Sequence, residues 1–140
     1  MPHTVRDWMS SPVVVVDPDS SVSYAMTLMR RRNIHSVVVD LSSEGSRLYG
    51  ILTITDIRDK ILSEDRNPAE LRVREIMSSP VITGKPEWSL KEAAQLMQKH
   101  KFHHLPVADQ SGTLVGLISD TDIFIAVEES GWGEKAKAKS

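Results

Sequence analysis

The chain contains one pattern twice, and this internal repeat restricts its fold more than any other feature. Residues 50–56 read GILTITD and residues 116–122 read GLISDTD, 66 positions later. A second segment, VRDWMSSPV at residues 5–13, recurs as VREIMSSPV at residues 73–81. Repetition over this length is typical of a supersecondary unit that buries its apolar face against a copy of itself. The sequence therefore predicts two similar halves.

The repeat also sets the expected domain boundaries. We place the first repeat at residues 5–64 and the second at residues 73–128. Residues 65–72 form a polar linker between them, and residues 129–140 form a mobile C-terminal tail. A half of about 70 residues buries little core alone, so we expect the two repeats to share one.

The composition excludes several classes of protein. The net charge is −2 at pH 7 and the pI is about 6.2, whereas binders of nucleic acid or anionic membranes are usually basic. The chain has no cysteine, which excludes disulfides and thiolate metal sites. The first residues lack the apolar run of a signal peptide, and no apolar segment approaches the roughly 20 residues that span a bilayer. We therefore expect a cytoplasmic protein without nucleic-acid or membrane partners.

Each repeat is predicted to form a strand, a helix, two further strands and a last helix, which is an α/β (α+β) fold. Short apolar runs bounded by turn residues indicate the strands, and apolar residues at helical spacing indicate the first helices. Ser21 and Ser89 are the expected N-caps of those helices, and Glu92 completes a capping box with Ser89. The expected strands are 13–16, 37–39 and 48–52 in the first repeat, and 81–83, 105–107 and 114–118 in the second. The expected last helices are 55–62 and 121–127.

A hydroxyl and a carboxylate three residues apart open both of these last helices: Thr53 with Asp56, and Ser119 with Asp122. A capping box is a sufficient structural interpretation of this spacing. The functional interpretation is that the helix N-terminus suits a phosphate and that the acceptor-only carboxylate suits a ribose diol. A capping box does not explain the glycine three residues earlier, whereas a close backbone or ligand approach would.

The chain resembles the cystathionine β-synthase (CBS) domain over residues 5–127. The resemblance depends on the two lead-in segments, on HHLPV with its weaker partner HSVVVD, and on GILTITDI and GLISDTDI, which follow in the same order twice. It implies a tandem pair, or Bateman module, in which the repeats pack about a pseudo-twofold axis into a disc. It also implies clefts between the repeats for AMP, ADP, ATP, S-adenosylmethionine or NAD. Members usually form dimers and report the ligand to an enzyme, channel or transporter.

The resemblance also assigns roles to individual positions. The two aspartates would hold the ribose hydroxyls, Thr53 and Ser119 would lie by the phosphate, and a basic residue would stand just before the second strand. Apolar residues after the glycines and backbone atoms at the strand entries would contact the adenine. The implied ligand-binding residues are Thr53, Asp56, Ser119, Asp122, Gly50, Gly116, Ile51, Leu117, His35, His103, Val13 and Val81.

Some alternatives stay open at this stage. His35 and His103 are equally well explained as turn histidines, and Asp120 adds an anion that disfavours a multiply charged phosphate in the second site. His100, His103 and His104 lack a nearby carboxylate, so Mg²⁺ carried by nucleotide phosphates is preferred over a zinc site. No nucleophile–base pair, metal set or phosphate loop indicates an enzyme or an obligatory cofactor. The main alternative is an interaction module with vestigial clefts, and nucleotide hydrolysis is a distant third.

Overall fold

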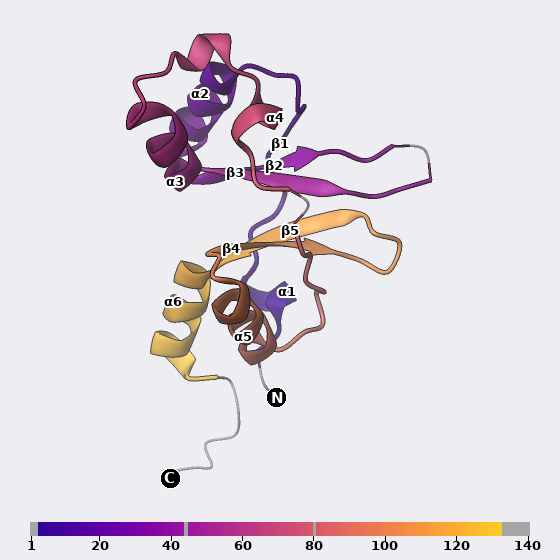
Figure 1. Cartoon of the computed structure of the whole chain (residues 1–140). Coiled ribbons are helices and arrows are strands. Elements are labelled where there is room, and N and C mark those ends of the chain that lie inside the picture. Colours follow the sequence, from indigo (N-terminus) through magenta and orange to yellow (C-terminus); the bar gives the residue numbers. More distant parts are fainter. Residues whose placement is uncertain (1–2, 44, 80, 133–140) are drawn as a thin grey trace. The chain divides into compact units, whose positions relative to one another are not determined.

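The computed structural model describes residues 3–43, 45–79 and 81–132. It divides the chain into two compact units, which are described separately here (Figure 1). The continuous unit is residues 14–81. The split unit combines residues 1–13 with residues 82–140.

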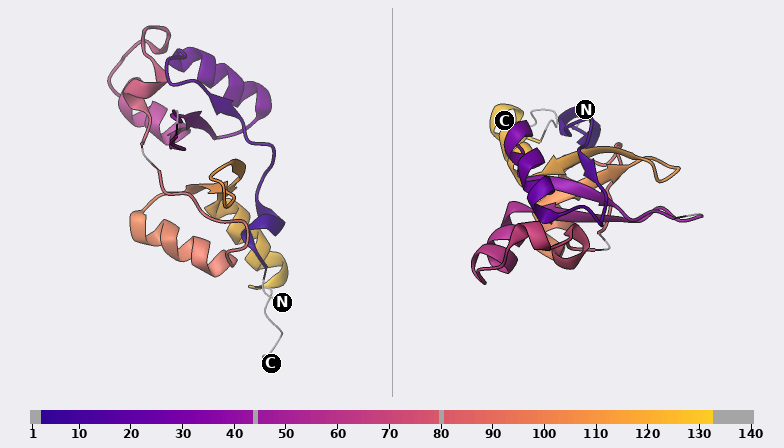
Figure 2. Two further views of the ribbon diagram at one scale, coloured as in Figure 1. Left: turned by 90° about the vertical axis from the view of Figure 1, so that its right-hand side faces the viewer. Right: turned by 90° about the horizontal axis from the view of Figure 1, so that it is seen from above.

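The continuous unit has a three-stranded sheet of order β1-β2-β3 with its helices on one face (Figures 1 and 2). β1 is parallel to β2, with Val15 opposite Val38, and β2 is antiparallel to β3, with Val38 opposite Ile51. The π-helical segment η1 directly continues α3, so the expected helix 55–62 is present. The elements are β1 (Val15–Val16), α2 (Val22–Arg32), β2 (Ser36–Asp40), β3 (Tyr49–Thr53), α3 (Ile54–Ile57), η1 (Arg58–Leu62), η2 (Pro68–Glu70) and α4 (Val73–Ile76).

Local signals account for these elements. Ser21 caps α2 as expected, because its side chain accepts a hydrogen bond from the Tyr24 amide. β2 is buried at every position except Asp40, as a continuous apolar run predicts. The expected linker is not wholly irregular, because Asn67 caps the short helix η2.

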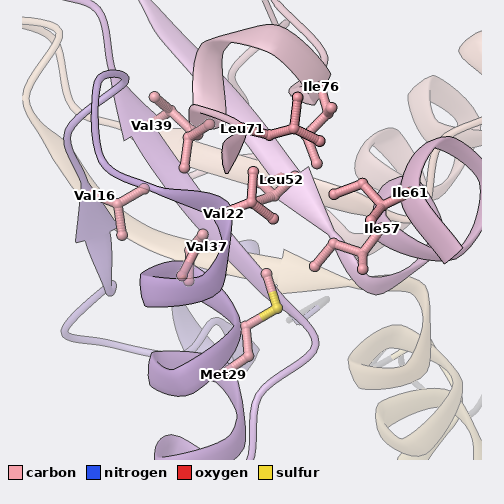
Figure 3. Close-up of a cluster of buried hydrophobic side chains, with 12 residues drawn as sticks. Val16, Val22, Met29, Val37, Val39, Leu52, Ile57, Ile61, Leu71 and Ile76 are labelled. Carbon is pink, nitrogen blue, oxygen red and sulfur yellow. The ribbon is translucent and has the colours of Figure 1, made fainter. Parts of the chain in front are cut away.

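The core of the continuous unit combines the sheet with residues that follow the first repeat in the sequence (Figure 3). Leu52 of β3 and Val22 of α2 are fully buried in it. Leu71 from the end of the linker, and Val73 and Ile76 from the lead-in of the second repeat, are buried in the same cluster. The second lead-in therefore completes the core of the first repeat.

The split unit repeats this plan with a smaller sheet. β4 and β5 pair antiparallel, with Pro106 opposite Leu117, and its helices lie on one face of the sheet (Figures 1 and 2). Ser89 and Glu92 form the expected capping box of α5. The elements are α1 (Val5–Trp8), α5 (Leu90–His100), β4 (His104–Ala108), β5 (Leu114–Ser119) and α6 (Asp120–Ser130).

Two sequence expectations for the second repeat are wrong. Residues 81–83 form no strand, and a single parallel bridge between Gly84 and Val107 stands in its place. The pairing residue is a glycine because a Cβ there would lie 2.7 Å from Leu105 Cδ2, and a strand glycine has no side chain to pack. The second correction is that α6 extends to Ser130, so residues 129 and 130 are helical. The rest of the expected tail, residues 133–140, lies outside the described residues.

The lead-in at residues 5–13 packs against the second repeat, and the lead-in at residues 73–81 packs against the first repeat. Val5 donates to the Trp88 carbonyl (2.8 Å), and Val73 donates in the same way to the Ser20 carbonyl (2.9 Å). Arg74 Nε also bonds Asp19 Oδ1 at 2.7 Å, and this hydrogen bond holds the pKa of Asp19 below its usual value. The compact units therefore differ from the repeats that we delimit by sequence.

Lys101 ends α5 in the left-handed conformation, with φ of 60°. Asn33 holds the equivalent position after α2, and asparagine tolerates this conformation better than lysine does. We expect Lys101→Gly to raise the free energy of unfolding by about 0.5–1 kcal/mol, because glycine avoids the Cβ clash. Lys99→Gly, inside the same helix, should instead lower it by about 1 kcal/mol. Urea unfolding of both variants checks this, and a loss of stability in Lys101→Gly would contradict it.

Among the helices in the described part of the chain, none is both long and apolar enough to cross a lipid bilayer.

Candidate functional site

In the continuous unit, the expected pair Thr53 and Asp56 forms a reciprocal capping box at the junction of β3 and α3. Asp56 Oδ2 accepts hydrogen bonds from the Thr53 amide (3.0 Å) and the Thr53 hydroxyl (3.1 Å). The Thr53 hydroxyl accepts in turn from the Asp56 amide (3.1 Å). Lys60 Nζ lies 3.4 Å from Asp56 Oδ1 and donates to the Ile76 carbonyl at 2.9 Å. The carboxylate is thus held at both oxygens.

In the split unit, Ser119 and Asp122 build the same box at the junction of β5 and α6. Asp122 Oδ2 accepts from the Ser119 amide (2.8 Å) and the Ser119 hydroxyl (3.0 Å). Asp122 Oδ1 has no hydrogen-bond partner among residues 3–43, 45–79 and 81–132. The structural interpretation of both motifs is therefore confirmed, and the hydrogen of each hydroxyl already points to a carboxylate. A phosphate contact from Thr53 or Ser119 would require that hydroxyl to rotate.

The lead-ins explain the two strand glycines. A Cβ on Gly116 would lie 2.4 Å from Met9 Sδ, and a Cβ on Gly50 would lie 3.0 Å from both Met77 Sδ and the Ser78 carbonyl oxygen. The close approach expected at Gly50 and Gly116 is thus made by the chain itself. Met9 and Met77 both lie in the repeated lead-in, but they are not among the residues predicted from the sequence.

The lead-ins also pair with the strands beside those glycines. Ser78 exchanges two backbone hydrogen bonds with Ile51, each 2.9 Å, and Ser10 exchanges two with Leu117, at 2.8 and 3.1 Å. The last residue of each lead-in is the strand entry named above. Each aspartate therefore lies in the same unit as the strand entry that belongs to the other repeat. Asp56 shares its unit with Val81, and Asp122 shares its unit with Val13.

These two strand entries differ in their backbone groups. The Val81 amide donates to the Tyr49 carbonyl at 3.0 Å. The Val13 amide and carbonyl have no hydrogen-bond partner within the described part of the chain. Val13 therefore has two backbone groups without a hydrogen-bond partner among the described residues, whereas the Val81 amide has one.

Both predicted histidines stand next to the helix N-termini. The His35 carbonyl accepts from the Ile54 amide (3.0 Å), and the His103 carbonyl accepts from the Asp120 amide (3.0 Å). Both side chains are exposed. His103 Nδ1 lies 2.7 Å from Asp120 Oδ2, whereas the apolar Ile54 holds the corresponding position in the other unit. The Asp122 site thus carries a carboxylate–imidazole pair that the Asp56 site lacks.

The same histidine lines a hollow of about 400 Å³ between α5 and α6, together with Met97, Lys101, Phe102 and Asp120. Neither Ser119 nor Asp122 belongs to that lining. The described residues contain no group of three or more histidine, cysteine, aspartate or glutamate side chains that could hold a metal ion.

Lys60 is the residue of the candidate site that sequence reasoning missed. It lies one helical turn after Asp56, and an i, i+4 pair of opposite charges is a readable signal. The signal has no counterpart in the second repeat, where Ala126 holds the equivalent position, so a search for shared features passes over it.

Comparisons with known proteins identify the family of this chain. The family model described as the CBS domain matches residues 5–63 and 73–129. The CBS domain-containing protein YhcV of Bacillus subtilis is 33% identical over 122 residues, which cover 87% of this chain and 84% of YhcV. Other curated relatives are longer, since the chain spans 56% of one and 22% of another.

Solved structures show the same fold. The hexameric CBS-CP12 protein from bloom-forming cyanobacteria is 31% identical, with a TM-score of 0.87 over 99% of this chain and 78% of that one. The CBS domain pair of protein MJ0100, solved with 5′-methylthioadenosine and S-adenosyl-L-methionine, is 25% identical, with a TM-score of 0.80 over 93% of this chain and 99% of that one. Because the family model matches two segments that together span most of the sequence, this chain belongs to the CBS domain family.

Proposed function

We propose that the chain is a non-catalytic sensor module that binds adenosine-containing ligands. The candidates are AMP, ADP, ATP and S-adenosylmethionine, with Mg²⁺ entering only through nucleotide phosphates. The ligand would shift the conformation of a homodimer that regulates an enzyme or transporter. Such a shift requires the ligand to bind one state better than the other.

The observation that supports this proposal is the carboxylate that opens the last helix of each repeat. A capping box uses one oxygen of an aspartate and leaves the other for a partner. A carboxylate only accepts hydrogen bonds, and a ribose diol donates two. The related MJ0100 domain pair binds two ligands that both contain such a diol.

The alternative function is a protein-interaction module, and the exposed apolar side chains favour it. Phe124 is 69% exposed on α6 and Leu62 is 61% exposed at the end of η1. The related CBS-CP12 protein is a hexamer, so members of this family do use their surfaces for assembly. Under this alternative no adenosine compound would bind.

Calorimetry with AMP, ATP and S-adenosylmethionine tests the proposal. We expect at least one to bind the wild type, and Asp56→Asn/Asp122→Asn to weaken that binding at least tenfold, because each hydrogen bond to a carboxylate contributes about 1.5–3 kcal/mol. Asparagine keeps the shape of the capping side chain. We expect no nucleotide turnover with Mg²⁺.

Asp59→Asn/Glu128→Asn is the matched control, since it removes two exposed carboxylates from the same helical segments. Its affinity should equal that of the wild type. Absence of binding by all three compounds, or unchanged affinity in Asp56→Asn/Asp122→Asn, would favour the interaction module.

A further inference from the structure

The two ribose-binding candidates differ in how many hydrogen bonds they can still accept. A carboxylate offers about four lone-pair positions, two on each oxygen. In both units, the backbone amide and the hydroxyl of the N-cap residue use the two positions of Oδ2. A ribose diol must therefore be accepted by Oδ1.

Lys60 holds this oxygen in the continuous unit. Its ammonium lies 3.4 Å from Asp56 Oδ1, and the 2.9 Å hydrogen bond to the Ile76 carbonyl fixes the ammonium there. The Asp56 side chain is 12% exposed and the Lys60 side chain is 44% exposed, so water screens this ion pair in part. The Lys60 ammonium therefore competes with the ribose hydroxyls for Asp56 Oδ1.

Nothing comparable holds Asp122. Ala126 is buried at the position of Lys60, and Oδ1 of Asp122 is unpaired within the described ranges. The strand entries also differ: the Val81 amide donates to the Tyr49 carbonyl within its unit, whereas neither backbone group of Val13 has a hydrogen-bond partner among the described residues.

We infer that the chain binds one adenosine ligand, at Asp122 in the split unit, and that Lys60 keeps the Asp56 site closed by occupying the oxygen that the ribose needs. This inference rests on the proposed function, because it concerns which of the two carboxylates receives the sugar. Lys60 thus occupies the Asp56 site in place of a ligand.

Titration calorimetry of the full chain with 5′-methylthioadenosine tests this inference, because that compound has the ribose diol and no phosphate. The wild type should bind one equivalent per chain. Asp122→Asn should weaken binding at least tenfold, and Asp56→Asn should leave it within twofold. 2′-Deoxyadenosine should bind at least tenfold more weakly than adenosine.

Lys60→Met should open the Asp56 site, since methionine keeps the apolar stem and removes the ammonium. We expect this variant to bind about two equivalents, the second of which disappears in Lys60→Met/Asp56→Asn. Arg58→Met is the control, because Arg58 is exposed and pairs with the exposed Asp59, and this variant should leave one equivalent.

The outcomes separate the two proposals. Binding of two equal equivalents by the wild type, or one equivalent that is lost in Asp56→Asn and kept in Asp122→Asn, would overturn the closed-site inference and leave the sensor function standing. One equivalent in Lys60→Met, folded as judged by circular dichroism, would also overturn it. Absence of binding by any adenosine compound, in the wild type and in Lys60→Met, would overturn both.

Discussion

A fragment of residues 14–81 should fold as a monomer, whereas residues 5–64, which follow the sequence boundary of the first repeat, should not. The longer C-terminus supplies Leu71, Val73 and Ile76, which are 8%, 0% and 1% exposed. Burying such side chains stabilises by about 1.5–3 kcal/mol each, or about 5–9 kcal/mol together as an upper estimate. That is comparable to the whole stability of a small domain, which is about 5–15 kcal/mol.

Far-UV circular dichroism and urea unfolding of the two fragments at micromolar concentration distinguish them. Residues 14–81 should give a cooperative transition, and residues 5–64 should give a spectrum without ordered helix and no transition. The N-terminal lead-in cannot replace the missing one, because Trp8 holds the position of the fully buried Ile76 and would overpack that core. Equal cooperativity in both fragments would show that the lead-in contacts contribute little.

The second large effect is expected from Ile76→Ala in the whole chain. Ile76 lies on the lead-in helix α4 and is buried against the first repeat, so truncation leaves a cavity. We expect a loss of about 2–5 kcal/mol in the free energy of unfolding. Urea unfolding followed by far-UV circular dichroism measures it.

Leu62→Ala is the matched control for this substitution, because Leu62 is an aliphatic side chain of the same size that is 61% exposed. It should change stability by less than about 0.5 kcal/mol. Equal losses in the two variants would mean that Ile76 is not part of the core.

Tryptophan fluorescence is less suited to these measurements on the continuous unit. All three tryptophans, Trp8, Trp88 and Trp132, belong to the split unit.

Much of the fold could be predicted because the repeat provides two independent copies of each signal. Ser21 and Ser89 cap the predicted helices, and the apolar runs form β2 and β4. The strand at 81–83 was predicted wrongly because Gly84, interpreted as its end, is the residue that pairs. A glycine can interrupt a strand or can lie under a bulky neighbour, and periodicity does not separate these cases.

The candidate site was predictable only in the parts that both repeats share. The two capping boxes follow from the spacing of Thr53 with Asp56 and of Ser119 with Asp122. The sequence could not show which lead-in covers which glycine, because that depends on long-range packing between identical patterns. The i, i+4 pair of Asp56 and Lys60 occurs in one repeat only, so a comparison of the features that both repeats share does not find it.

The exchange of lead-ins has a consequence for how such a chain could arise. A polypeptide with one lead-in and one repeat would keep its lead-in away from its own core, as each half does here. It could complete that core only by exchanging lead-ins with a second molecule. The product would be a domain-swapped homodimer. Gene duplication and fusion of such a swapped pair would then give a single chain with the connectivity seen here, in which both exchanged segments are covalently tethered.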